Sequence, residues 1–164
     1  MKRIVLAFLV FVVTYASPFL SAEQFKKPVY YKLGDQQKAD QVISAPFTHS
    51  GNLDLAVANY LTNEVSILLG NGDGTFQKAL TFPVSAPTAI AVGDLNQDGN
   101  QDLVVIEYGG TGNSTLGIFL GDGTGHFRKN VAYLLGVQSV QIAVDDFNHD
   151  GHQDIAVTNK GLND

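Results

Sequence analysis

Short apolar runs separated by turn residues recur along the chain at a nearly fixed spacing. Three segments start with a phenylalanine and then alternate apolar and polar residues: 25–31, 76–82 and 127–133. The starting phenylalanines are 51 residues apart in both intervals, because 76 − 25 and 127 − 76 give the same difference. Alternation with a period of two predicts β-strands that expose one face. The chain is therefore predicted to repeat a β unit of about 51 residues.

Each repeat contains two predicted hairpins. Apolar runs at 65–69 and 116–120 are followed by glycine-rich turns at 70–74 and 121–125, and then by a phenylalanine strand. A second hairpin joins the runs 89–92 and 103–106, and its copy joins 141–144 and 155–158. These runs are apolar on both faces, as expected for strands covered by neighbouring sheets. The predicted fold is all-β, a partial β-propeller of four-stranded antiparallel blades.

The turn of the second hairpin is acidic and occurs twice with the same spacing. Residues 94–102 and 146–154 both read D-x-N-x-D-G-x-x-D. Oxygen-bearing side chains at alternate positions, with a glycine that lets the loop turn sharply, are the pattern that calcium requires. Numbering each loop from one to nine, we predict ligands from the side chains at positions one, three, five and nine and from the backbone carbonyl at seven. They are Asp94, Asn96, Asp98, Asn100 and Asp102 in the first loop, and Asp146, Asn148, Asp150, His152 and Asp154 in the second.

Other readings of these loops fit the sequence less well. An EF-hand loop has a glutamate at position twelve followed by a helix. Position twelve is Val105 in one copy and Val157 in the other, both inside a predicted strand. Asp, Asn and Gly also dominate ordinary turns, but identical spacing at the same place in a repeat favours metal binding. The sequence predicts two calcium ions, one in each loop.

An earlier copy of the loop has lost most of the predicted ligands. Aligned on Asp54, residues 46–54 place Pro46, Thr48 and Ser50 at positions one, three and five. Calcium affinity depends on the number of charged ligands. This copy is therefore predicted to hold no ion.

The acidic loop followed by an apolar strand, together with Gly-Asn-Gly-Asp-Gly-Thr-Phe at 70–76, resembles the FG-GAP/VCBS repeat family. Integrin α-subunit propellers are its best-known members. The resemblance extends over about residues 25–164 and implies a β-propeller with calcium in the loop between the first two strands of a blade. No residue here matches the ligand-binding residues of integrins.

The first residues are predicted to be a targeting segment. Lys2 and Arg3 precede an apolar run at 4–13, and small residues follow up to Ala22. This is the layout of a secretory signal peptide at 1–22, which leaves residues 23–164 as the repeat domain. Ten apolar residues are too few to span a bilayer. We therefore expect a secreted protein, extracellular or periplasmic, with no stable membrane span after cleavage.

Composition narrows the possible partners. The chain has 10 basic and 16 acidic residues, a net charge of −6, and no cysteine. No basic stripe is available to neutralise phosphates, so nucleic acid is not an expected partner. Without cysteine no disulfide supports the fold, and a bound metal is one of the few other ways to stabilise a small exported domain.

The sequence contains no recognisable catalytic constellation. It has neither a G-x-S-x-G elbow nor a pair of histidines at zinc-site spacing. We expect an exported calcium-binding β-repeat module that acts as a non-catalytic binding or adhesion scaffold for an unknown protein or carbohydrate ligand. The alternative is the propeller portion of an exported carbohydrate-active or lipid-cleaving enzyme.

Length predicts an incomplete ring. Removing residues 1–22 leaves 164 − 22 = 142 residues, or about 2.8 repeats of 51. Propellers typically close with about four to eight blades. The predicted architecture is therefore an open arc, truncated in its third unit, which would have to self-assemble if the chain is complete.

Overall fold

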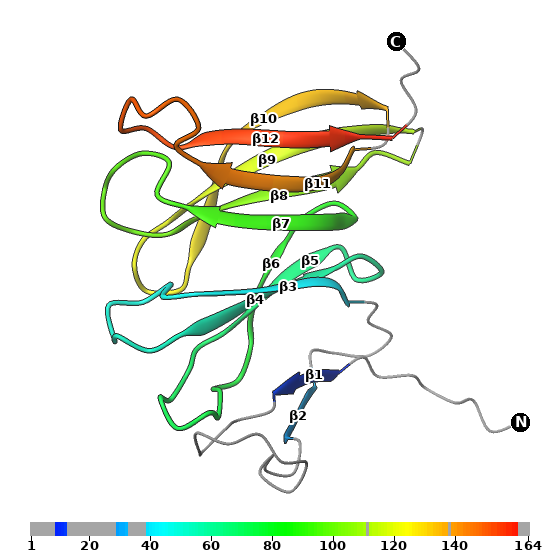
Figure 1. Ribbon diagram of the computed structural model, residues 1–164. Helices are drawn as coiled ribbons and strands as arrows, with labels where there is room; N and C mark the ends of the chain where they lie inside the picture. Colours follow the sequence, from blue (N-terminus) through cyan, green and yellow to red (C-terminus); the bar gives the residue numbers. More distant parts are fainter. Residues whose placement is uncertain (1–8, 13–28, 33–38, 111, 138, 161–164) are drawn as a thin grey trace, which may run out of the picture.

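The computed structural model describes residues 9–12, 29–32, 39–110, 112–137 and 139–160. Within these ranges the chain forms β-strands and no helix, which confirms the all-β prediction (Figure 1). The described part thus contains no helix with the length and apolar character needed to cross a membrane. Most of the predicted signal peptide lies outside the described residues. Its residues Leu9–Val12 form strand β1, which pairs antiparallel with β2 (Val29–Lys32).

The repeats form successive antiparallel sheets. The first has the order β3-β4-β5-β6 and comprises Ala39–Ala45, Asp54–Asn59, Glu64–Leu68 and Leu80–Pro83. The second runs from β7 to β10 in sequence order and comprises Pro87–Gly93, Asp102–Tyr108, Asn113–Gly121 and Phe127–Val137. A third sheet contains two strands, β11 (Ser139–Asp145) and β12 (Asp154–Asn159). Each of the apolar runs expected to form the two hairpins lies in one of these strands or ends just beyond it.

One predicted strand is shorter than expected. The segment 76–82 was expected to be extended from its phenylalanine onward, but β6 begins only at Leu80. Phe76 instead makes an isolated bridge with Gly70. Its backbone N–H donates to the Tyr31 hydroxyl of β2 at 2.9 Å, and the two rings meet edge to face. The N–H of Gln77 also donates to the Leu69 carbonyl at 2.8 Å, so the start of the segment contacts both β2 and the residue just after β5 without continuous strand pairing.

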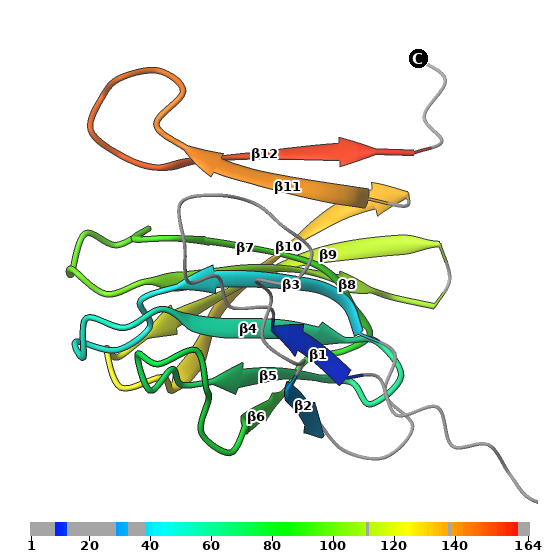
Figure 2. The same cartoon turned by 60° about the horizontal axis from the view of Figure 1, so that its bottom comes forward.

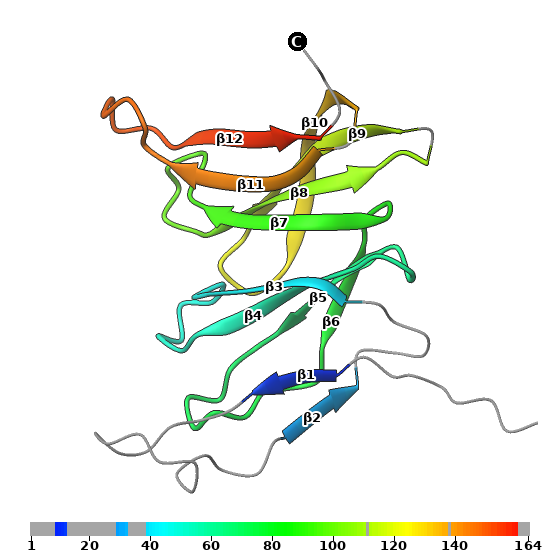
Figure 3. The ribbon, with the colours of Figure 1, turned by 45° about the vertical axis from the view of Figure 1, so that its right-hand side comes forward.

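The sheets follow one another as layers of an open arc. The first strands of successive sheets, β3, β7 and β11, lie side by side, while the β1–β2 hairpin lies at the opposite end of the arc from β11–β12 (Figures 1 and 3). Sheets of four, four and two strands fit the predicted partial propeller, and the described residues do not close a ring.

The main core lies between the first and second sheets. Ile67, Ile90 and Val105 are buried there, and aromatic rings from both sheets interlock. Phe82 packs on Phe119 with ring centroids 5.3 Å apart. Every residue of β8 except the last is buried, as expected for a strand covered on both faces.

The third sheet departs from that expectation. Its strands were expected to be covered on both faces, but no residue of β12 is fully buried, and Val140 of β11 is 46% exposed. Figure 2 shows β11 and β12 as the last layer of the arc, with no described strand beyond them. The apolar pattern of this hairpin therefore matches that of the buried repeats although one of its faces is uncovered.

Candidate metal loops

The two acidic loops lie where the repeat places them, between the first two strands of a sheet. Residues 94–102 connect β7 to β8, and residues 146–154 connect β11 to β12. The earlier copy, 46–54, connects β3 to β4. All three loops project from the same end of the strands (Figure 1). Gln97 also links the two acidic loops, because its side-chain amide donates to the Gly151 carbonyl at 2.6 Å.

In the first acidic loop the oxygens at positions one, three and five all turn into the loop. The Asp94 carboxylate accepts the backbone N–H groups of Asp98 at 3.1 Å and Gly99 at 2.9 Å. The Asn96 amide oxygen accepts the N–H of Asp98 at 3.1 Å. The Asp98 carboxylate in turn accepts the N–H of Asn100 at 2.8 Å. Backbone N–H groups thus orient the oxygen-bearing side chains at all three positions.

The second acidic loop repeats this network. The Asp146 carboxylate accepts the N–H groups of Asp150 at 3.1 Å and Gly151 at 2.9 Å. The Asn148 amide oxygen accepts the N–H of Asp150 at 2.8 Å, and the Asp150 carboxylate accepts the N–H of His152 at 2.8 Å. The same bonds form although this hairpin is largely exposed. The loop conformation therefore comes from its own sequence and not from burial.

The backbone angles of the two loops also agree. The glycines at position six, Gly99 and Gly151, have φ values of +85° and +87°. Position four is left-handed as well, with φ of 59° at Gln97 and 62° at His149. A residue with a Cβ is disfavoured there by about 1–2 kcal/mol. Both loops therefore tolerate the same local strain in the same place.

The aspartate at position nine has a structural role that the sequence analysis missed. Asp102 is fully buried and accepts two backbone N–H groups, from Leu95 at 3.0 Å and from Gly121 at 2.9 Å. Leu95 belongs to the acidic loop, whereas Gly121 opens the glycine-rich turn between β9 and β10. Asp102 therefore ties the two turns of one blade together.

The earlier copy keeps the same tie. Asp54 is also fully buried, and its carboxylate accepts the N–H groups of Phe47 at 2.9 Å and Gly70 at 2.8 Å. In the third sheet Asp154 accepts the N–H of Phe147 at 3.1 Å. The persistence of Asp54 in a loop that has lost its other acidic residues was the sequence signal for this role.

Carboxylate crowding in the first acidic loop affects ionisation. Burial raises the pKa of Asp102 above its usual value, and repulsion from Asp98 and Asp94 adds to the rise. The N–H groups of Gly121 and Leu95 oppose it. The three carboxylates are therefore close enough to destabilise one another when all are charged. A cation among them would relieve that repulsion.

The aspartate at position five is held in its charged form in both loops. The N–H of Asn100 lowers the pKa of Asp98, and the N–H of His152 lowers that of Asp150. Hydrogen bonds donated to a carboxylate favour ionisation. Each loop therefore offers a charged oxygen at an exposed predicted ligand.

The oxygens of each loop fit a hard cation. No group of three or more His, Cys, Asp or Glu side chains is arranged for metal binding within the part of the chain that the structure describes. The fit therefore depends first on two carboxylates, one amide oxygen and the backbone carbonyl at position seven. The carboxylate at position nine accepts N–H groups but keeps further lone pairs that could reach an ion. Calcium takes six to eight such oxygens, water included. Asn96, Asp98 and Asn100 line a cavity of about 550 Å³, which leaves the first loop open to an ion.

Comparison with known proteins agrees with this architecture. A protein-family model described as an FG-GAP-like repeat matches the chain twice, at residues 47–105 and 94–157. Each match runs from one loop of the series through the next. No curated protein matches the chain significantly. Together the two matches extend over residues 47–157, which is more than half of the 164-residue sequence. The chain belongs to the FG-GAP-like repeat family.

Proposed function

We propose that this protein is an exported, calcium-stabilised β-repeat scaffold with a non-catalytic binding or adhesion role. The observation that carries the proposal is the identical network of oxygens in the two acidic loops. Asp94, Asn96 and Asp98 hold the first ion, with the Asn100 carbonyl and Asp102 completing the set. The corresponding residues from Asp146 to Asp154 hold the second.

Calcium serves a structural purpose in this proposal. The ion neutralises carboxylates that otherwise repel one another, and it fixes the link between the first two strands of a blade. At a free concentration ten times the dissociation constant, each bound ion adds about 1.4 kcal/mol to the free energy of unfolding. Extracellular calcium modules often have dissociation constants of about 10⁻⁴–10⁻³ M. Such affinities match the exported location that the sequence predicts.

Calcium titration of the purified chain tests the proposal. Isothermal calorimetry is expected to find two ions per chain, with magnesium binding more weakly because it requires tighter geometry and sheds water reluctantly. The unfolding temperature should rise with calcium and fall again with EDTA. A stoichiometry of zero would refute the calcium assignment. A third ion would contradict the assignment of the earlier copy as empty.

Single substitutions assign each ion to its loop. Asp98→Asn and Asp150→Asn remove a charge but keep an oxygen that accepts the N–H of position seven. Each is expected to remove one ion from the calorimetric count, and the double variant should bind none. Asp73→Asn is the matched control, since Asp73 is an exposed acid in the glycine-rich turn 70–74, outside both loops and outside the cavity at the first loop. If Asp98→Asn and Asp150→Asn leave the stoichiometry at two, the ligand assignment is wrong.

A further inference from the structure

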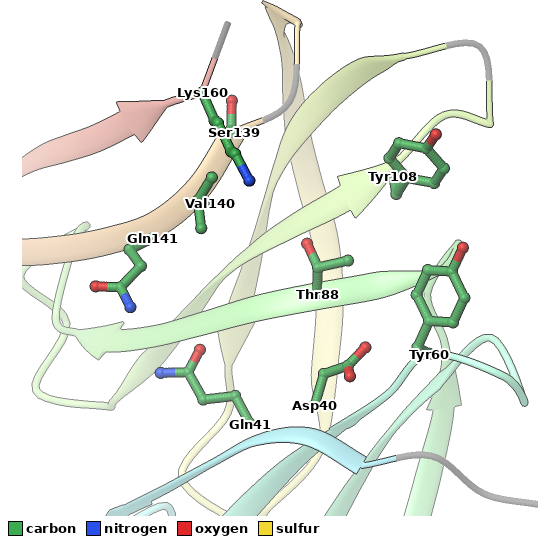
Figure 4. Close-up of a pocket in the computed structure, with 9 residues that line it drawn as sticks. All are labelled: Asp40, Gln41, Tyr60, Thr88, Tyr108, Ser139, Val140, Gln141 and Lys160. Carbon is green, nitrogen blue, oxygen red and sulfur yellow. The ribbon is translucent and has the colours of Figure 1, made fainter.

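A second cavity lies at the end of the strands opposite the acidic loops. It has a volume of about 740 Å³ and is bounded by residues from all three repeats (Figure 4). Small-molecule sites usually have volumes of about 300–1,000 Å³. The cavity is formed where β3, β7 and β11 begin and where β4, β8 and β12 end. Neither the family match nor the metal loops account for it.

The same backbone feature, a β-bulge near the start of the first strand, occurs at the cavity in all three sheets. The register between the first two strands breaks after Ala39, Pro87 and Ser139, so that one extra residue is inserted in each first strand. Such β-bulges redirect a side chain and often lie beside binding sites. The inserted residues are Asp40, Thr88 and Val140, and all three line the cavity.

A second set of equivalent positions, at or just after the ends of β4, β8 and β12, completes the lining of the cavity. The sixth residue after each position-nine aspartate is Tyr60, Tyr108 or Lys160, and each lines the cavity. The aspartate itself is identical in every repeat, whereas the cavity positions differ in chemistry. The fold therefore requires aspartate at position nine of the loops, but it requires no particular residue type at the cavity end of the same strands. The frame therefore leaves these positions free to carry binding groups, as rigid scaffolds commonly do.

Two aromatic rings form one side of the cavity. The Tyr60 and Tyr108 rings lie next to each other, with centroids 6.4 Å apart and planes tilted by 39° (Figure 4). Both side chains are only half-buried. Tyrosine offers an apolar face for stacking and a hydroxyl for hydrogen bonding at the same place. This combination suits a ligand that carries both C–H faces and polar groups.

Amide and hydroxyl groups lie across from the rings. The Gln41 side-chain oxygen accepts the N–H of Ile90 at 2.8 Å, which fixes its amide at the edge of the cavity. Gln141 occupies the corresponding place on β11 and is exposed (Figure 4). Side-chain amides offer two donors and an acceptor each. They can bind several hydroxyl groups of one ligand.

Charge at the cavity is balanced. Asp40 and Lys160 are the ionisable acid and base among the residues that line it, and their charges cancel. A strongly anionic or cationic ligand would meet no matching field. The combination of two adjacent tyrosine rings, two side-chain amides and balanced charge points to a neutral carbohydrate. We infer that this cavity is a binding site for a neutral oligosaccharide, an inference that rests on the proposed binding role but not on the calcium sites.

Direct binding to defined sugars tests the inference. The probes are cellohexaose, laminarihexaose, xylohexaose and mannohexaose, with heparin as a charged comparison, titrated into the full chain in calcium. The chain has six tyrosines and no tryptophan, so tyrosine fluorescence is followed alongside calorimetry, and the signal change that is lost in Tyr108→Ala is assigned to the cavity. At least one neutral hexasaccharide is expected to bind saturably, whereas heparin is not.

Three variants locate the site. Tyr108→Ala is expected to weaken sugar binding by at least about tenfold, because aromatic anchors dominate binding energy. Gln141→Ala, at an exposed position that does not threaten the fold, is expected to weaken it by about three- to tenfold. Tyr133→Ala is the matched control, since Tyr133 is an exposed tyrosine on β10 outside the cavity, and it should leave affinity unchanged. Circular dichroism confirms that each variant is folded.

The outcomes separate this inference from the calcium proposal. Failure of all four neutral sugars to bind, or binding only to heparin, overturns the inference. Sugar binding that Gln141→Ala and Tyr108→Ala leave intact overturns it as well. Calcium stoichiometry is measured on the same samples. Two bound ions with no sugar binding overturn the sugar site and support the calcium proposal, whereas sugar binding with no bound ion supports the sugar site and refutes the calcium proposal.

Discussion

Replacing Asp102 with alanine is expected to lower the free energy of unfolding by about 3 kcal/mol, even without calcium. The change removes a buried acceptor that serves the N–H groups of Leu95 and Gly121. A hydrogen bond to a charged group contributes about 1.5–3 kcal/mol. Part of this is offset, because burial and nearby carboxylates already disfavour the charged form of Asp102. Urea unfolding in EDTA, followed by circular dichroism, measures the loss.

Asp54→Ala is the matched variant for a loop that is predicted to hold no ion. Asp54 accepts the N–H groups of Phe47 and Gly70 in the same arrangement. Its loss of stability should be similar in EDTA and in calcium. The loss for Asp102→Ala should grow in calcium, because Asp102 is also a proposed ligand. The difference between the two variants in the two buffers therefore separates the structural tie from the metal contribution.

An exposed aspartate provides the control. Asp122 accepts the N–H of Thr124 at the surface, and Asp122→Ala is expected to change stability by no more than about 0.5–1 kcal/mol. If the two buried aspartates have effects no larger than this, position nine does not tie the turns of a blade together. Its persistence in the earlier copy would then need another reason.

Strand positions could be predicted from the sequence because they depend on local patterns. Apolar runs bounded by glycine-rich or acidic turns correspond to β5, β7, β8, β9, β11 and β12. The acidic loops were also placed correctly between the first two strands of a sheet. Their internal hydrogen bonds join residues only two to seven positions apart, so the sequence contains nearly all that determines their shape.

Features that depend on distant residues could not be predicted in this way. The start of the segment before β6 contacts Tyr31, 45 residues away from Phe76. The exposure of β11 and β12 depends on which strands follow them in space, although their sequence resembles that of the buried repeats. The cavity with Tyr60 and Tyr108 is assembled from three repeats. No local pattern marks residues that meet only when the blades stack.

The two ends of the strands differ in how strongly the fold restricts residue type. At the loop end, position nine and the glycine it binds are identical in the first two blades, where the aspartate accepts backbone N–H groups and the glycine leaves no room for a Cβ. At the opposite end, the bulge residues Asp40, Thr88 and Val140 differ, since a bulge constrains the backbone more than the side chain. A repeat protein can therefore keep its frame and change its binding surface independently.

Gly121→Ala is expected to lower the free energy of unfolding by about 3 kcal/mol, near the upper end of the usual range for overpacking. An added Cβ would lie closer than 3.0 Å to the Gln101 carbonyl oxygen and 3.2 Å from the Phe127 ring. The carbonyl belongs to the backbone directly before Asp102, so it cannot rotate away. Gly70, 51 residues earlier, faces the Leu53 carbonyl in the same way, and Gly70→Ala should have a similar effect.

The clash at Gly121 and the loss of the Asp102 hydrogen bonds affect the same turn. The losses in the free energy of unfolding for Gly121→Ala and Asp102→Ala should therefore not add. Moving Gly121 away from Gln101 also weakens its N–H bond to Asp102. The Asp102→Ala/Gly121→Ala double variant is therefore expected to be about 1 kcal/mol more stable than the sum of single losses predicts.

Gly110→Ala is the control for backbone strain alone, since Gly110 has φ of +73° and open space around its Cβ position. It should lower stability by about 1 kcal/mol. Equal losses for Gly110→Ala and Gly121→Ala would show that close packing against Gln101 is not what requires glycine at position 121.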